Sequence, residues 1–259
     1  MPLKTFLACS FILAVLVTAE GRDCPEKYKR FTPDHTFCKD PNPTCKVYQR
    51  GVTEEQKKLI LKVHNEYRSR LATGQEKLAG GLPTAANMME LEWDEELAII
   101  AQRHAESCDF NHDCNKCRRV ERFSVGQNIG MSSINSPNMP EINWTNFIKD
   151  LYDEVVYFDK KLMKPFVPAP EESETTYGHF TQLAWGTSSK VGCGFVMFED
   201  DDDWNTNFYV CNYGPGGNVR GGEMYKQGAT CSECPSNSCC GDSCKKQGVK
   251  AQFPGLCKA

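Results

Sequence analysis

The segment GHFTQLAW at residues 178–185 decides the fold, and three further motifs accompany it along the chain. HNEYR at residues 64–68 and GQNI at residues 126–129 come before it, and FYVCNYGPGGNV at residues 208–219 comes after it. Each motif alone is weak evidence, because short matches occur by chance. Four motifs in this order are specific, and all of them lie in the main body predicted at residues 52–226.

Three segments of this body have the apolar spacing and capping residues of helices. Thr53 and Gln56 form a capping-box pattern at the start of the segment that contains HNEYR. Asp94 is the expected N-cap of the second helix. The third helix is predicted over residues 145–158, where the apolar side chains recur at helical spacing.

Four polar residues belong to the first two predicted helices. Asn65 and Arg68 are expected to tie the first helix to neighbouring segments of the chain. His64 and His104 lie on the inner helix faces, where a histidine is more often a hydrogen-bonded core residue than a ligand. The sequence therefore predicts that these residues are structural.

The later part of the body has the pattern of strands. Residues 192–198 and 208–213 are short apolar runs separated by the acidic segment at residues 199–203, which predicts a hairpin with a polar tip. Cys193 and Cys211 lie about equally far from that tip, so a disulfide between the two strands is geometrically natural. Helices followed by a hairpin indicate the α+β class.

Composition limits the classes of function. The chain has 259 residues, a net charge of −4 and 15 cysteines. Without a basic excess, a nucleic-acid partner is not expected. Residues 1–19 combine Lys4, a short apolar run and small residues, which predicts a signal peptide cleaved after Ala19; no later run is long enough for a transmembrane segment. Cleavage would leave 14 cysteines, an even number typical of a disulfide-bonded secreted protein.

The spacing of the cysteines divides the rest of the chain. Residues 20–51 are predicted to be an N-terminal segment stapled by disulfides, residues 52–226 the main domain, and residues 227–259 a cysteine-rich tail. The tail has almost no apolar residues, so we expect that only disulfides hold its shape. In a secreted chain this expectation is favoured over a zinc site, although the sequence does not choose among the possible pairings. The tail cysteines are Cys231, Cys234, Cys239, Cys240, Cys244 and Cys257.

Taken together, the four motifs resemble the CAP superfamily of cysteine-rich secretory proteins, insect venom antigen five and plant pathogenesis-related proteins of the first class. Residues 108–129 look most like arthropod antigen five. The resemblance implies the CAP fold, a three-layer α-β-α sandwich with a central cleft, here with a small disulfide-stapled C-terminal extension. It places His112, Gln127, Glu154 and His179 in the cleft. Gln127 stands where many members have Glu, and a neutral amide cannot act as a base or an anionic ligand.

The resemblance also implies a weakly bound divalent cation such as zinc, with His112 and His179 as ligands. Only Glu154 could supply an anionic third ligand. The alternative, which we favour for function, is that hydrogen bonds hold both histidines and that no cofactor is required. A peptidase or other hydrolase would use His112, Glu154 and His179 in acid–base catalysis. That class is disfavoured, because no nucleophile motif accompanies them and Gln127 lacks a charge.

Two kinds of covalent modification follow from the sequence. Asn143, in the sequence Asn-Trp-Thr, is an N-glycosylation acceptor, with an unused sequon near a helix start as the alternative. The resemblance to antigen five implies four disulfides in the body. They are Cys45–Cys108, Cys193–Cys211, Cys24–Cys117 and Cys38–Cys114.

The function that the resemblance implies is that of a secreted, extracellular protein of the venom, saliva or allergen type. We expect it to be a monomer that acts by binding and not as an enzyme. It would bind a host or prey protein target, or sequester a small apolar ligand such as a fatty acid or a sterol. The alternatives are the hydrolase described above and an ion-channel modulator that acts through the cysteine-rich tail.

Overall fold

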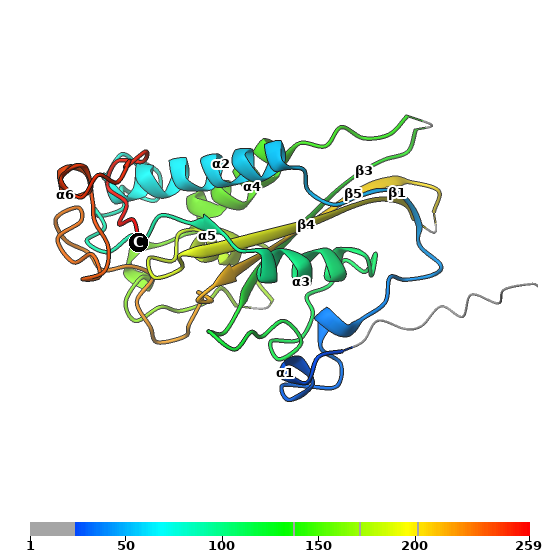
Figure 1. Cartoon of the computed structure of the whole chain (residues 1–259). Helices are drawn as coiled ribbons and strands as arrows, with labels where there is room; N and C mark the ends of the chain where they lie inside the picture. Colours follow the sequence, from blue (N-terminus) through cyan, green and yellow to red (C-terminus); the bar gives the residue numbers. More distant parts are fainter. Residues whose placement is uncertain (1–23, 137, 171, 201) are drawn as a thin grey trace, which may run out of the picture.

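A central sheet lies between two layers of helices in the computed structural model, which describes residues 24–136, 138–170, 172–200 and 202–259 (Figure 1). The predicted signal peptide and its cleavage site at Ala19 lie outside these residues. Helices α2 (Glu54–Ala72) and α4 (Trp144–Asp153) cover one face of the sheet, and α3 (Glu95–Ala105) covers the other. This is the expected α-β-α sandwich. None of the described helices is long and apolar enough to cross a membrane.

The sheet has the strand order β1-β4-β5-β3, and β2 runs parallel to the start of β4. Its centre is the antiparallel β4–β5 hairpin, which confirms the predicted hairpin and places Cys193 opposite Cys211. The strands are β1 (Lys46–Arg50), β2 (Glu92–Trp93), β3 (Gly126–Ile134), β4 (Lys190–Glu199) and β5 (Asn205–Gly214). The short helices are α1 (Glu26–Lys29), α5 (Gly178–Leu183) and α6 (Asp242–Lys246), with 3-10 turns at Thr36–Cys38, Glu154–Tyr157 and Lys160–Leu162.

Two glycines of β4 let helix α3 lie unusually close to the sheet. Gly192 and Gly194 share one face of the strand, because side chains alternate along a strand. A Cβ atom at Gly192 would lie 2.2 Å from the backbone nitrogen of Ala98, and one at Gly194 would lie 2.3 Å from that of Gln102. The alternating glycines therefore set the distance between these two layers.

The N-termini of two helices lie where the sequence predicts them, but the C-terminus of the third does not. Thr53 caps α2 in a complete capping box with Gln56, and the Asp94 side chain caps α3, as predicted. The third helix was predicted to reach residue 158, but α4 ends at Asp153 and continues as a 3-10 turn. The β-branched pair Val155–Val156 lies in this turn, and such side chains disfavour the α-helical conformation.

Buried polar side chains of α2 connect this helix to the rest of the core, as predicted. Asn65 exchanges two hydrogen bonds with the backbone of Leu91. The imidazole of His64 lies 2.8 Å from both the Ile60 oxygen and the Tyr213 hydroxyl. Arg68 is fully buried and donates to five backbone carbonyl groups, those of Met89, Leu183, Trp185, Gly186 and Ser188.

The disulfides agree with the resemblance at two pairs and differ from it at two others. Cys45–Cys108 and Cys193–Cys211 are present. The structure does not contain Cys24–Cys117 or Cys38–Cys114, but joins Cys24 to Cys38 and Cys114 to Cys117. The reason is local distance, because a turn brings the Cα atoms of Cys114 and Cys117 to 4.9 Å.

Hydrogen bonds, rather than a disulfide, hold the N-terminal segment against the loop at residues 113–119. The backbone N–H of Thr36 donates to the Cys117 oxygen, and the Thr36 hydroxyl donates to Asp113. The His35 ring lies 2.8 Å from the Arg119 oxygen. His35 and Thr36 are therefore fixed against this loop, although the nearby disulfides Cys24–Cys38 and Cys114–Cys117 are local.

The cysteine-rich tail packs against the main body instead of standing apart from it. Leu256 is 1% exposed and belongs to the main hydrophobic core. Cys257 exchanges backbone hydrogen bonds with Met88 and Glu90. The expectation that disulfides alone give the tail its shape is therefore wrong, because core burial and backbone pairing contribute. The tail disulfides are Cys231–Cys240, Cys234–Cys257 and Cys239–Cys244.

Candidate functional site

His112 and Gln127 form the first of two hydrogen-bonded pairs. The Nδ1 atom of His112 lies 2.8 Å from the Oε1 atom of Gln127, which is on strand β3. The Gln127 amide nitrogen donates to the Asn212 side chain, so Oε1 is the acceptor and Nδ1 carries the proton. Burial lowers the pKa of His112, the hydrogen bond to Gln127 opposes this shift, and the nearby positive charge of Arg118 adds to it. Burial therefore favours the neutral imidazole.

His179 and Glu154 form the second pair, at the junction of α4 and α5. The Nδ1 atom of His179 lies 2.6 Å from Oε1 of Glu154. The other carboxylate oxygen accepts the backbone N–H groups of His179 and Phe180, at 2.8 and 3.2 Å. The Glu154 side chain is 12% exposed, so it is mostly buried and accepts three hydrogen bonds. Its position at the end of α4 thus fixes the first turn of α5.

The four predicted cleft residues border two different cavities. His112 and Gln127 line a cleft of about 680 Å³ that also contains Gln182 and Asn218. Glu154 and His179 line a smaller groove of about 280 Å³. The resemblance placed all four residues in one cleft, whereas the structure arranges them as two pairs that border separate cavities. Asn128 lies next to Gln127 and donates to the backbone oxygen of His179, which keeps the two pairs near each other.

The side chains of His112, His179 and Glu154 are the candidate ligands for a divalent cation. In the described residues, the Nε2 atoms of His112 and His179 have no hydrogen-bond partner, while both Nδ1 atoms are held by oxygen acceptors. That arrangement suits metal binding through Nε2. Glu154 is occupied by three donors, so this chain offers two nitrogen ligands, one fewer than a catalytic zinc site normally uses. Among the described residues, His112, His179 and Glu154 therefore do not form a complete zinc site.

A second group of metal-type ligands lies in the tail. Among the described residues, only Cys231, Cys234 and Cys240 bring three possible ligand atoms within 4.8 Å of one another. All three sulfurs are in disulfides, Cys231–Cys240 and Cys234–Cys257. A disulfide sulfur is not a thiolate, so this cluster does not provide a zinc site in the oxidised chain.

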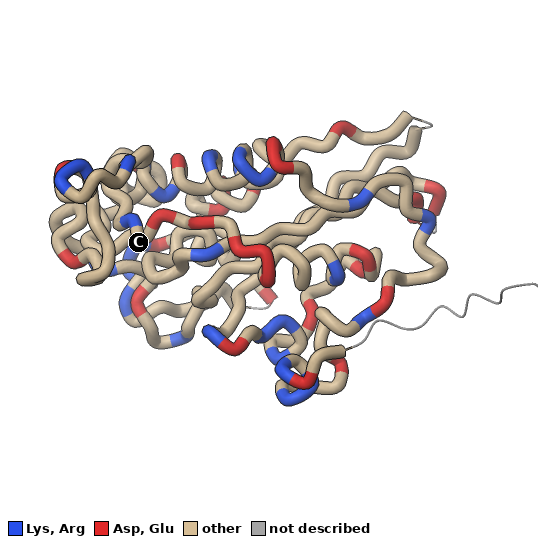
Figure 2. The backbone as a smooth tube through the Cα atoms, in the orientation of Figure 1, with Lys and Arg blue, Asp and Glu red and all other residues tan. Residues whose placement is uncertain are grey.

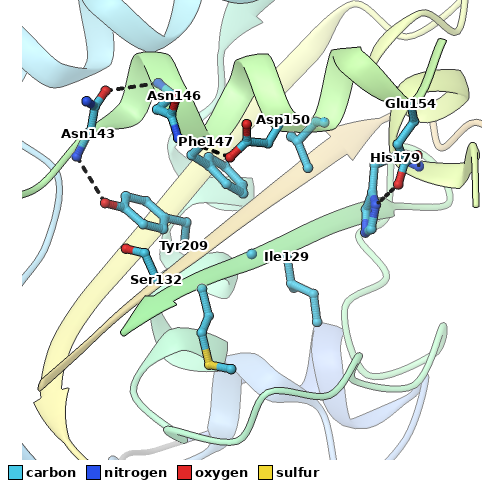
Figure 3. Close-up of a pocket in the computed structure, with 12 residues that line it drawn as sticks. Ile129, Ser132, Asn143, Asn146, Phe147, Asp150, Glu154, His179 and Tyr209 are labelled. Atoms are coloured by element: carbon cyan, nitrogen blue, oxygen red, sulfur yellow. Dashed lines mark hydrogen bonds and ion pairs between the residues drawn. The ribbon is translucent and has the colours of Figure 1, made fainter. Parts of the chain in front are cut away.

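The groove at Glu154 runs between helix α4 and strand β3, and we call it the α4–β3 groove (Figure 3). Glu154 and His179 lie at one end of it and Asn143 lies at the other. Six residues of α4 and its flanks face it at helical spacing, and four consecutive residues of β3 form the opposite side. The lining consists of Ile129, Gly130, Met131, Ser132, Asn143, Asn146, Phe147, Asp150, Leu151, Glu154, His179 and Tyr209.

Close packing beneath the groove depends on one glycine. A Cβ atom at Gly130 would lie 2.6 Å from the ring of Phe147, so the absence of a side chain lets α4 lie over β3. Phe147 in turn stacks on Tyr209, with ring centroids 4.9 Å apart. The backbone N–H of Asn143 donates to the Tyr209 hydroxyl. The floor of the groove is thus aromatic and rigid, while its rim is polar.

The strand side of this groove has no clear signal in the sequence. The segment GQNIGMSSI has no period-2 alternation of apolar and polar residues, so nothing in it predicted strand β3. On the helix side, the helical spacing predicted at residues 145–158 puts Phe147 and Leu151 on an inward face, and both are buried. The role of Asp150 on the rim had no signal, because an exposed carboxylate on a helix is common.

Asn143 occupies a defined structural position at the mouth of the groove. It is exposed, and its side-chain oxygen caps α4 by accepting the backbone N–H of Asn146. An N-linked sugar is attached to the side-chain nitrogen, so glycosylation is compatible with the cap. Use of the sequon remains a proposal.

Comparison with known proteins agrees with this geometry. The model of the cysteine-rich secretory protein family, CAP, matches residues 61–213, and the chain belongs to this family. It is of the arthropod venom antigen-five type. It is 42% identical over 255 residues to venom allergen 5 of Tityus serrulatus, and 47% identical over 240 residues to the CRISP/Allergen/PR-1 protein of Trittame loki. The alignments cover 98% and 93% of this chain but only 60% and 57% of those relatives.

Solved structures show the same fold. The crystal structure of Na-ASP-1 is 28% identical, with a TM-score of 0.64, and the match covers 85% of this chain and 52% of that one. The crystal structure of NaASP2 with Zn2+ is 27% identical, with a TM-score of 0.56, and the match covers 78% of this chain and 97% of that one. The zinc ion belongs to that protein, and the likeness establishes the fold of this chain.

Proposed function

We propose that this chain is a secreted binding protein of the venom type, which recognises an extracellular protein target without catalysis. Its family and the seven disulfides among its described residues fit an extracellular protein. One observation carries the proposal. The four polar cleft residues are paired with one another by hydrogen bonds, whereas the α4–β3 groove, which Glu154 and His179 border at one end, presents further polar and aromatic surface.

The pairing of the cleft residues is unfavourable for hydrolysis. A general base must accept a proton from a substrate or a water molecule. Glu154 already accepts three hydrogen bonds, and the partner of His112 is the neutral amide of Gln127. A cation held by the Nε2 atoms of His112 and His179 would polarise a ligand oxygen, but this chain's residues would hold it with two ligands. We therefore propose that metal, where bound, has no catalytic role.

Sequestration of a small apolar ligand is the second candidate, favoured by the aromatic floor of the α4–β3 groove. Phe147, Leu151 and Tyr209 supply apolar surface there. Asp150 and Glu154 also line the groove, and no Lys or Arg does, so a fatty-acid carboxylate would be repelled. A neutral ligand such as a sterol suits the groove better. The ion-channel alternative depends on the tail, and no contact in the structure favours it specifically.

The binding proposal is tested by measuring peptide hydrolysis by the parent chain and by a variant that lacks the His179 side chain. Purified full chain is incubated with mixed peptide substrates and zinc, and products are followed by mass spectrometry. We expect no products from the parent chain or from His179→Ala. Products that appear with the parent chain and disappear with His179→Ala would establish the hydrolase instead.

A further inference from the structure

Strand β3 forms one edge of the sheet, and its outer side faces the α4–β3 groove. It pairs with β5 from Gly126 to Ile134 without any shift in register. In the described residues, no strand pairs with its other side. An edge strand presents N–H and C=O groups that can pair with another chain. Here that edge lies along a groove whose far wall is a helix.

The two edges of this sheet differ in their protection. Natural proteins usually blunt an edge strand with charge, proline or a bulge. Strand β1 has Lys46 and Arg50 within five residues, and a register shift between Val47 and Gln49. Strand β3 has none of these devices in its nine residues, GQNIGMSSI. Figure 2 shows basic positions on β1 and none along β3. The edge at β3 is therefore left open.

The length and charge of the groove indicate what would bind there. Ile129 to Ser132 line it as four consecutive strand residues, a length of about 13 Å. Asp150 and Glu154 are the charged residues of the α4 wall, and no Lys or Arg lines the groove. Glu154 is occupied by three donors. Asp150 is exposed and accepts one hydrogen bond, from the Asn146 side chain at 3.1 Å, so it is available to a cation.

We propose that the α4–β3 groove binds an extended peptide segment of a target protein, which adds as a strand to the free edge of β3. A Lys or Arg side chain of that segment pairs with Asp150. Main-chain hydrogen bonds to β3 supply affinity, and the helix wall selects the side chains. The inference rests on the proposed function, because it names the part of a protein target that the groove recognises.

The first experiment identifies a probe. Full-length protein is panned against a phage-displayed library of linear heptapeptides, and the selected peptides are resynthesised with acetylated and amidated ends. We expect enrichment of β-branched residues around a Lys or Arg. Each backbone N–H of the best peptide is then methylated in turn. Methylation should weaken binding by about tenfold or more at alternate positions and have little effect between them, as one side of a strand requires.

Charge-reversed variants test the groove itself with a matched control. Asp150→Lys should weaken binding of the selected peptide by at least about tenfold, because attraction becomes repulsion. Asp153→Lys makes the same change in net charge on α4, at an exposed residue outside the groove, and should leave binding unchanged. Both positions are exposed, and circular dichroism will show that the variants fold.

Several results would overturn the inference. They are binding that is insensitive to methylation, equal effects of Asp150→Lys and Asp153→Lys, or selection of acidic peptides. Self-association of the chain through β3, seen as a dimer that Asp150→Lys leaves intact, would assign the edge to a second copy instead. None of these results would produce peptide hydrolysis, so failure of the inference and failure of the proposed function are distinguishable.

Discussion

The Glu154 carboxylate provides the sharpest test of how the site is built. We consider Glu154→Gln, which preserves size and removes the charge. The carboxylate accepts the Nδ1 proton of His179 at 2.6 Å and two backbone N–H groups at 2.8 and 3.2 Å. An amide has one oxygen, so its NH2 group must face either His179 or the backbone donors. If the NH2 group faces His179, the ring proton must move from Nδ1 to Nε2 so that Nδ1 can accept; if it faces the backbone, two N–H donors are left opposite another donor.

The size of the effect follows from these three bonds. A hydrogen bond to a charged group contributes about 1.5–3 kcal/mol, against about 0.5–1.5 kcal/mol for a neutral one. Weakening three bonds by about 1 kcal/mol each lowers the free energy of unfolding by about 3 kcal/mol. For a chain of this size that corresponds to a fall in Tm of about 6–12 °C. The side chain is 12% exposed, so solvent screening is small.

The same variant should change metal binding through the histidine. If the amide donates to His179 Nδ1, the ring proton moves to Nε2, and that atom no longer has a lone pair for a cation. We expect zinc affinity to fall by about 10–100-fold. Calorimetric scanning measures Tm, and titration calorimetry with zinc measures the affinity.

Asp150→Asn is the matched control, because it neutralises a carboxylate of the same groove that accepts one hydrogen bond. As an exposed residue it should change the free energy of unfolding by no more than about 0.5 kcal/mol. A loss of Tm in Glu154→Gln no larger than that in Asp150→Asn would refute the view that Glu154 organises the start of α5.

Three further outcomes are expected. Arg68→Met should cost more than about 4 kcal/mol in urea unfolding, because it leaves five buried carbonyl groups without their donor; a cost below about 1 kcal/mol would contradict this. Burial lowers the pKa of His64 to about 4, from 6.5. The neutral ring therefore contributes fully to the free energy of unfolding above pH 6.5, and about 3 kcal/mol of that free energy is lost as the pH falls towards 4. The urea midpoint should therefore depend less on pH in His64→Gln. Leu256→Ala should lower stability by about 2–4 kcal/mol, since it removes a buried core side chain, and an unchanged Tm would mean that the tail is independent of the body.

Local sequence patterns predicted the structure correctly where the stabilising interactions join residues that are close together in the chain. The capping box at Thr53 and the cap at Asp94 depend on residues three positions apart, and the structure has both. The β4–β5 hairpin depends on two apolar runs joined by a polar tip. Strand β3 was missed, because its glycine, amide and serine residues have no strand pattern until β5 lies beside them.

Disulfide pairing and tail packing show the limit of motif matching. The pairs Cys45–Cys108 and Cys193–Cys211 lie where the family pattern places them. The partners of Cys24 and Cys114 depend on how the surrounding loops turn. The spacing of cysteines along the chain does not give the distances between them in the folded protein. The burial of Leu256 in the core could not be predicted, because a single apolar residue in a polar tail has no periodicity.

By itself, the sequence determined the α+β class, the helix caps and the hairpin, which depend on residue type and near-neighbour spacing. The three-layer arrangement and the four cleft residues followed from the resemblance of its motifs to the CAP superfamily. Only the tertiary structure decided that His112 pairs with Gln127 and His179 with Glu154, and that these pairs border two cavities. It also decided that the open edge of β3 lies opposite Asp150 on α4. Both arrangements depend on distances between segments far apart in the chain, and packing of the three layers sets those distances.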